Sequence, residues 1–137
     1  MLAIRLYRSS DLERVVALWH ACDLVVPWND PQRDIETKLA YQPDLFFVGE
    51  HDGYLVASVM AGYEGHRGWI NYLAVDPACQ RTGFGREMMD HAEERLRSLG
   101  CPKINLQVRS RNQAIIRFYE SLGFSRDDAV SLGKRLG

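Results

Sequence analysis

The run Gln80-Arg81-Thr82-Gly83-Phe84-Gly85 separates a strand-like stretch, residues 69–75, from a helix-like stretch, residues 83–99. Glycine allows turn conformations that a Cβ would hinder, so the peptide N–H groups between Arg81 and Arg86 can point at an anion. The partial positive charge at the N-terminus of the following helix adds to that attraction. The loop therefore predicts a cradle for a pyrophosphate group. It is not a Walker A loop, because no Lys-Ser or Lys-Thr follows the glycines, and it lacks the Rossmann pattern Gly-x-Gly-x-x-Gly.

A second segment supports a cofactor site. It reads Asn112-Gln113-Ala114-Ile115-Ile116-Arg117-Phe118-Tyr119-Glu120-Ser121-Leu122-Gly123-Phe124. Together with Val75-Asp76-Pro77-Ala78-Cys79 and the glycine loop, it resembles the two cofactor-binding motifs of the GNAT superfamily, the acyl-CoA-dependent N-acyltransferases. In that family the first motif reads Val-x-Pro-x-x-(Arg/Gln)-x-x-Gly-x-(Gly/Ala), and the second begins with Asn and ends with Phe-Tyr-x-x-x-Gly-Phe. Both occur here in the family's order.

The resemblance implies an α/β fold with a mixed, mostly antiparallel central sheet and flanking helices. Strands 69–75 and 103–108 would form a parallel pair that splays apart, and acetyl-CoA would be the acyl-donor co-substrate. Its pantetheine arm carries two amides that can pair with a strand edge. The backbone of Leu73, Ala74 and Val75 would bind that arm, and an N–H near Leu73 or Ala74 would polarise the thioester carbonyl. Asn112 would both cap a helix and contact the arm.

The chemistry implied by the family is direct attack of an amine on the thioester in a ternary complex. Tyr119 stands where the family uses a tyrosine as general acid, and a phenol with a pKa of about 10 can protonate the departing thiolate. The attacking ammonium must first lose a proton, directly or through water. Glu64, which follows strand 54–63, is the first candidate for the base, and Asp30 is the second. Cys79 lies beside the phosphate loop without a His-Asp pattern, and we expect no catalytic role for it.

In the resembled family the first two helices and their connection wall the acceptor pocket, and here that region reads Cys22-Asp23-Leu24-Val25-Val26-Pro27-Trp28-Asn29-Asp30-Pro31. Trp28 offers an aromatic face to a cation, and Asp23 and Asp30 offer carboxylates to an amine. The alternative is a rigid helix connection with a buried tryptophan and a capping aspartate. The segment resembles small uncharacterised bacterial GNAT proteins with a similar Pro-Trp-Asn-Asp-Pro stretch. The predicted partner is a small-molecule amine or a peptide or protein amino group, and a non-catalytic acyl-CoA-binding sensor remains the alternative function.

Hydrophobic periodicity and turn signals predict the secondary structure around these residues. Ser10 and Glu13 read as a capping box for a first helix, and Asp30-Pro31 as the start of a second. Asp52-Gly53 predicts a tight hairpin turn, and Gly100 the end of helix 83–99. The expected strands are 3–8, 45–51, 54–63, 69–75, 103–108 and a weak final strand at 130–134, with a helix between Asn112 and Gly123.

Composition excludes several other classes. The chain of 137 residues predicts one domain over 1–137, and a formal net charge of −1 argues against a nucleic-acid partner. No apolar run approaches the roughly 20 residues of a membrane span, so no membrane association is expected. Three separated cysteines offer no zinc spacing, which predicts a cytoplasmic protein without a metal site. The short segment after Phe124 makes a homodimer plausible, with a second subunit completing the last strands.

Overall fold

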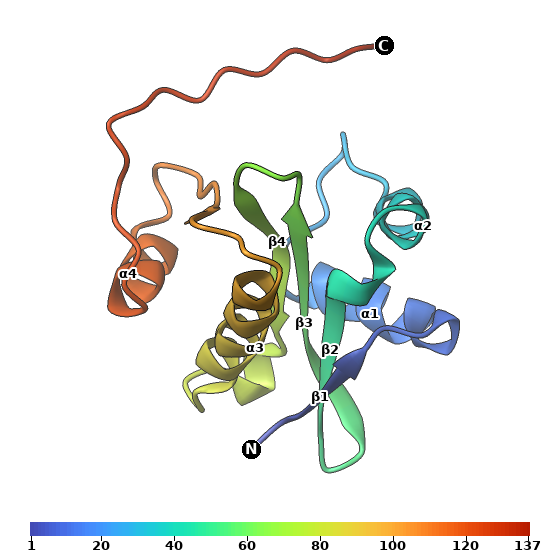
Figure 1. The fold of residues 1–137 in the computed structure, drawn as a ribbon. Coiled ribbons are helices and arrows are strands. Elements are labelled where there is room, and N and C mark those ends of the chain that lie inside the picture. The colour runs from blue at the N-terminus through green and yellow to red at the C-terminus, as the bar shows by residue number, and fades with distance from the viewer. The chain divides into compact units, whose positions relative to one another are not determined.

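A computed structural model describes all of residues 1–137. The chain divides into two compact units, Met1–Leu106 and Gln107–Gly137, and each is described by itself. The first unit contains a five-stranded sheet in the order β1-β2-β3-β4-β5 (Figure 1). The strands are β1 (Ala3–Leu6), β2 (Phe46–His51), β3 (Tyr54–Tyr63), β4 (Gly68–Val75) and β5 (Ile104–Asn105).

The first four strands pair antiparallel and β4 pairs parallel with β5, which confirms the predicted mixed sheet. The β2–β3 hairpin turns at Asp52 and Gly53, as predicted. Their φ angles of 52° and 81° are those of a type I′ turn. Strand β1 ends at Leu6 rather than at residue 8, and β5 is two residues long rather than the six predicted for 103–108.

Three α-helices of the first unit are α1 (Leu12–Ala21), α2 (Pro31–Ala40) and α3 (Phe84–Ser98). Short 3₁₀ turns lie at Ser9–Asp11, Pro43–Leu45 and Pro77–Cys79. Successive strand residues point to opposite faces of a sheet. Val48 accordingly packs in a core cluster with Trp19 of α1 and Ile35 of α2. On the other face of β2, Phe47 meets the ring of His91 on α3. The sheet is thus covered on both faces, by α1 and α2 on one and by α3 on the other (Figure 1).

The predicted capping box at Ser10 and Glu13 is wrong. Helix α1 begins at Leu12, because Asp11 folds a 3₁₀ turn ahead of it and accepts a hydrogen bond from the Arg8 N–H at 2.8 Å. The Asp11 side chain is fully buried and pairs with the guanidinium groups of Arg5 at 2.8 Å and Arg14 at 2.9 Å. A buried carboxylate needs such compensation, so this cluster decides where the chain turns into the helix.

The second unit contains one helix, α4 (Gln113–Ser121), which Asn112 caps by accepting from the Ile115 N–H, as predicted. The strand predicted at 130–134 does not form, and the side chain of Val130 is 85% exposed. A strand needs a partner for its backbone groups, and the weak alternation of this segment finds none within its own unit. No helix of the protein combines the length and the apolar character needed to cross a membrane.

Candidate active site

Strand β4 carries a bulge beside the end that leads to the glycine loop. Asn71 pairs with Met60 and Ala74 with Ser58, so Tyr72 and Leu73 together face one residue of β3. Tyr72 adopts a φ of 52°, which is uncommon for a side chain of this bulk. Bulges of this kind recur next to active sites, where they redirect a side chain or end the pairing of a strand.

Buried contacts hold the bulge in place. The Ser58 hydroxyl donates to the Tyr72 carbonyl at 2.9 Å and accepts from the Trp19 indole N–H at 2.9 Å. The Trp19 ring also stacks on the Tyr72 ring with centroids 3.7 Å apart. Ser58 and Trp19 are both fully buried. The unusual backbone of Tyr72 is therefore fixed by side chains from β3 and α1, and not by its own sequence neighbours.

The parallel pair separates soon after it forms. Strand β5 pairs with β4 only at Gly68 and Trp69, so the part of β4 from residue 71 onward has no β5 neighbour. Leu73 lies outside both registers, because the bulge also displaces it from the β3 ladder. This is the splayed arrangement that the family resemblance implies. Whether Leu73, Ala74 and Val75 bind a pantetheine arm with their backbone stays a prediction.

The glycine loop leads from β4 into α3 as expected. Gly83 is the N-cap residue of α3 with a φ of 88°, and Arg81 has a φ of 65°. The Thr82 hydroxyl donates to the Cys79 carbonyl at 2.5 Å, and the Gln80 amide donates to the Val75 carbonyl at 3.1 Å. These two side chains therefore brace the loop. Anion binding by the N–H groups of residues 81–86 and of α3, including Phe84, Gly85 and Arg86, stays a prediction.

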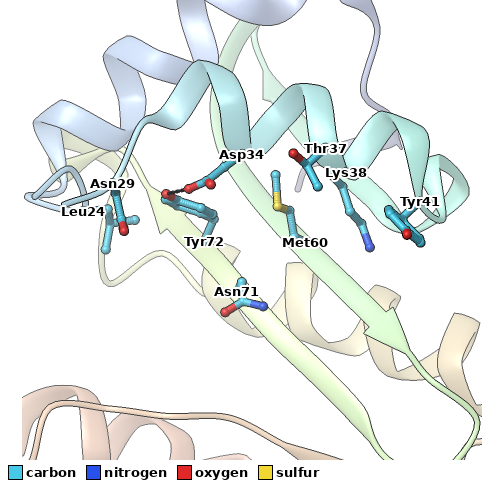
Figure 2. A pocket seen from close by; sticks show the side chains of 9 residues that line it. All are labelled: Leu24, Asn29, Asp34, Thr37, Lys38, Tyr41, Met60, Asn71 and Tyr72. Atoms are coloured by element: carbon cyan, nitrogen blue, oxygen red, sulfur yellow. Dashed lines mark hydrogen bonds between the residues drawn. The ribbon is translucent and has the colours of Figure 1, made fainter. Parts of the chain in front are cut away.

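A pocket of about 690 Å³ opens between α2 and strands β3 and β4 (Figure 2). The residues that line it are Leu24, Asn29, Asp34, Thr37, Lys38, Tyr41, Met60, Asn71 and Tyr72. Residues three and four apart share one face of a helix, which explains how α2 brings Asp34, Thr37 and Lys38 to the pocket together. Tyr72 connects the pocket to the bulge, because its backbone belongs to the bulge and its ring lines the pocket.

One end of the pocket contains a tyrosine–carboxylate pair. The Tyr72 hydroxyl donates to the Asp34 carboxylate at 2.6 Å (Figure 2). Burial raises the pKa of Tyr72, and the hydrogen bond to Asp34 raises it further, while the Asn29 side chain acts weakly in the opposite direction. The phenol therefore keeps its proton at neutral pH. Tyr72 donates to one oxygen of the Asp34 carboxylate, so the other oxygen can accept from a second donor.

The other end of the pocket contains a half-buried lysine. The Lys38 ammonium donates a hydrogen bond to the Ala61 carbonyl on β3. Burial lowers the pKa of Lys38, and the charge of Asp44 partly opposes that effect. Gln42 fixes the adjoining end of β3, since its side chain accepts from the Tyr63 N–H at 2.9 Å and donates to the Tyr63 carbonyl at 2.7 Å.

The sequence-predicted acceptor residues lie near this pocket but do not line it. The Trp28 side chain is 59% exposed, so the alternative of a buried tryptophan is wrong. The Asp30 carboxylate accepts from the Arg33 N–H at 3.2 Å and caps α2, which is the alternative role foreseen for it. Asn29, between them, lines the pocket instead. Substrate binding by Trp28 and Asp30 stays a prediction.

Glu64 lies in the exposed turn between β3 and β4. Its carboxylate accepts hydrogen bonds from the backbone N–H groups of Arg67 and His66, each at 2.5 Å. These bonds lower the pKa of Glu64, the bond from Arg67 most strongly. A carboxylate with a lowered pKa is a weaker base, and both bonds give Glu64 a structural role in the turn. Its assignment as general base stays a prediction.

In the second unit, Tyr119 packs among aromatic rings of its own segment. Its centroid lies 5.2 Å from that of Phe118 and 5.6 Å from that of Phe124, both in edge-to-face geometry. Burial raises the pKa of Tyr119 to about 12. The phenol is therefore protonated throughout the physiological range, as a general acid must be before it acts. The catalytic role of Tyr119 and the cofactor contact of Asn112 stay predictions.

Sequence reasoning missed the residues that make this pocket, above all Asp34, Lys38 and Tyr72. One signal was available: Asp34 and Lys38 are four residues apart, on a helix whose buried residue is Ile35. A charged pair at that spacing normally indicates a solvent-exposed helix face, so the pattern alone would have favoured the surface. The pocket arises because β4 bulges under this face, and nothing local in the sequence marks the bulge.

Known proteins share the sequence and the architecture of this chain. Residues 12–124 match the model of the acetyltransferase (GNAT) family. The chain is 48% identical over 133 residues to an acetyltransferase of Yersinia enterocolitica, covering 97% of this chain and 94% of that protein. It resembles the structure of the ribosomal-protein-S18-alanine N-acetyltransferase from Escherichia coli, with a TM-score of 0.71, 27% identity and coverage of 93% and 79%.

A third similarity is one of fold alone. The structure of AAC(6′)-Iy in complex with the bisubstrate analogue CoA-S-monomethyl-acetylneamine has a TM-score of 0.79 at 16% identity, covering 100% of this chain and 99% of that one. The family match extends over most of the chain, and the Yersinia relative is matched along nearly its whole length. The chain therefore belongs to the GNAT family, and it is an acetyltransferase.

Proposed function

We propose that this protein transfers an acetyl group from acetyl-CoA to a primary amine, by direct attack of the amine on the thioester in a ternary complex. The observation that carries the proposal is the bulge at Tyr72 and Leu73. The bulge directs the Tyr72 ring toward the pocket, where it meets the Asp34 carboxylate. It also leaves Leu73 outside both strand ladders. One short stretch of β4 thus supplies an acceptor pocket and an open strand edge.

On the donor side, the pyrophosphate binds at the loop of residues 80–86, where backbone N–H groups and the N-terminus of α3 favour an anion. The pantetheine arm pairs with the backbone of Leu73, Ala74 and Val75, and the N–H near Leu73 or Ala74 polarises the thioester carbonyl. Asn112 contacts the arm. The CoA portion of the analogue bound to AAC(6′)-Iy, a protein of the same fold, supports an acyl-CoA donor.

On the acceptor side, an amine reaches the pocket as an ammonium ion, and the Asp34 carboxylate beside Tyr72 attracts it. The amine loses its proton to Glu64 or through water, attacks the thioester carbon and expels the CoA thiolate, and Tyr119 protonates that thiolate. Trp28 and Asp30, on the connection before α2, contact the part of the acceptor outside the pocket. The acceptor is a small-molecule amine or a peptide or protein amino group, and we expect a cytoplasmic enzyme that can form a homodimer.

The direct test is release of CoA from acetyl-CoA across a panel of amines, amino acids, polyamines and short peptides. We expect release that depends on one class of acceptor, with a product heavier by one acetyl group in mass spectrometry. Initial velocities at varied concentrations of both substrates should intersect, as they do for a ternary complex, and Cys79→Ser should behave as the wild type. Parallel lines, or an acetylated Cys79, would contradict direct transfer.

A further inference from the structure

Opposite charges line the two ends of one pocket. Asp34 and Lys38 both project from α2 into it, and Figure 2 places the Asp34 carboxylate toward Tyr72 and the Lys38 ammonium away from it, toward β3. The two residues are four apart, a spacing at which Glu or Asp and Lys often pair with each other. Here each finds a different partner: Asp34 the Tyr72 hydroxyl, and Lys38 the Ala61 carbonyl. The two charges therefore remain distinct.

The carboxylate end suits a cation. Asp34 accepts from Tyr72 at 2.6 Å, which fixes the orientation of the carboxylate without neutralising it. The Trp19 ring stacks on Tyr72 from the core side and holds the phenol in position. A carboxylate oriented in this way, at one end of the pocket, matches a primary ammonium group, whose N–H donors require acceptors.

The lysine end suits an anion. An ammonium carries three N–H donors, and the carbonyl of Ala61 accepts one of them. Asp44 is the other charge that acts on Lys38, but its carboxylate pairs with Arg95 of α3 at 3.3 Å. Burying a charge without a counter-ion is costly, as the lowered pKa of Lys38 reflects, and a bound carboxylate would compensate for it.

We infer that the acceptor is a zwitterion of the amino-acid type, whose ammonium group binds at Asp34 and Tyr72 and whose carboxylate binds at Lys38. This inference rests on the proposed function and narrows it. An acceptor with adjacent amino and carboxylate groups satisfies both ends of the pocket. A polyamine would bring a second cation to Lys38, and the N-terminus of a protein has no carboxylate beside its amino group, so both classes fit less well.

The test compares acceptors that differ only in the carboxylate: glycine with glycinamide, and leucine with leucinamide. The measured quantity is the ratio of kcat/KM for the acid to kcat/KM for its amide. We expect a ratio above one in the wild type, and a fall of roughly 10- to 100-fold in Lys38→Met, the size expected for losing a hydrogen bond to a charged group. Comparing this ratio between Lys38→Met and the wild type cancels the different amine pKa values of acid and amide, because both proteins meet the same pair of acceptors.

Two variants serve as controls. Lys38→Arg keeps the charge and should retain the preference for the acid. Lys134→Met removes the same charge from an exposed lysine of residues 122–137 and should leave the ratio as in the wild type. A ratio that Lys38→Met does not change would overturn the inference and leave Lys38 as a support for β3.

A second readout does not depend on turnover. The chain has three lysines, Lys38, Lys103 and Lys134, so protein labelled with ¹³C-lysine gives three Cε signals, and the one missing in Lys38→Arg belongs to Lys38. Glycine or leucine should shift that signal in the presence of CoA, and the two amides should not. If other amines of the panel are acetylated and neither glycine nor leucine is, the proposed function stands and the inference of a zwitterionic acceptor fails. If no amine is acetylated, the proposed function fails, and the inference fails with it.

Discussion

Replacing Tyr119 with phenylalanine should lower kcat about 100- to 10,000-fold, the usual contribution of a general acid, and leave the Kd for acetyl-CoA unchanged. The substitution removes only the hydroxyl, so the ring can keep its edge-to-face contacts with Phe118 and Phe124. With a pKa of about 12, the wild-type phenol is protonated at neutral pH and can serve as a proton donor. Steady-state kinetics at saturating acetyl-CoA and calorimetric binding measure the two quantities.

Tyr54→Phe is the matched control, because the Tyr54 side chain is 74% exposed on β3 and removal of its hydroxyl should change neither kcat nor Kd. Thermal unfolding of both variants separates catalysis from packing. If Tyr119→Phe unfolds at a much lower temperature, the loss of kcat reflects damage to the helix. If it folds normally and retains wild-type kcat, Tyr119 is not the general acid, and water protonates the thiolate.

Replacing Gly83 with alanine should raise the Kd for acetyl-CoA roughly tenfold or more, because strain of about 1–3 kcal/mol falls on the backbone that faces the pyrophosphate. Gly83 has a φ of 88°, where an L side chain is strained, although no atom lies within 4 Å of an added Cβ. The loop can relieve the strain only by rotating its peptide groups, which turns their N–H groups away from the anion. Calorimetric titration with acetyl-CoA measures the change.

Gly53→Ala provides an equivalent strain at a different place. Gly53 has a φ of 81°, also with open space around an added Cβ, and it lies in the β2–β3 hairpin turn. Both variants should lose a similar amount of stability on thermal unfolding, and only Gly83→Ala should lose affinity for acetyl-CoA. Equal affinities in the two variants would show that the loop does not bind the pyrophosphate through its backbone.

Local signals were sufficient for much of the fold. Asp52-Gly53 fixed the hairpin because two consecutive residues with positive φ favour this turn type. Asp30-Pro31 located the start of α2 because the cap and the proline both act within one helical turn. The glycine loop was predictable for the same reason, since Gly83 supplies a conformation that most other residues avoid.

The acceptor pocket could not be predicted in this way. Its shape depends on the bulge at Tyr72, which Trp19 and Ser58 hold from distant parts of the sequence. A run of strand-forming residues such as 69–75 looks the same with or without a bulge. Trp28, in the α1–α2 connection, was predicted to bind the acceptor because of its aromatic face. The residue that lines the pocket is instead Asp34, on the following helix.

The prediction of a final strand at 130–134 was wrong for a related reason. Residues 130–134 alternate weakly between apolar and polar positions, and the structure leaves Val130 and Leu132 exposed at 85% and 92%. Alternation indicates which faces a strand would present, but a strand forms only where another strand pairs with it. The shortness of β5 has the same origin, since its pairing with β4 extends only over Gly68 and Trp69.

The amine is proposed to bind beside Asp34, and Asp34→Asn removes the charge on which that binding rests. The amide keeps the size of the side chain and can still accept from Tyr72, but it carries no charge to attract an ammonium. We expect kcat/KM for the amine to fall roughly 10- to 100-fold while the Kd for acetyl-CoA stays at its wild-type value. Glu36→Gln, an exposed substitution on the same helix, should alter neither. An unchanged kcat/KM in Asp34→Asn would place the acceptor elsewhere and contradict the proposed site.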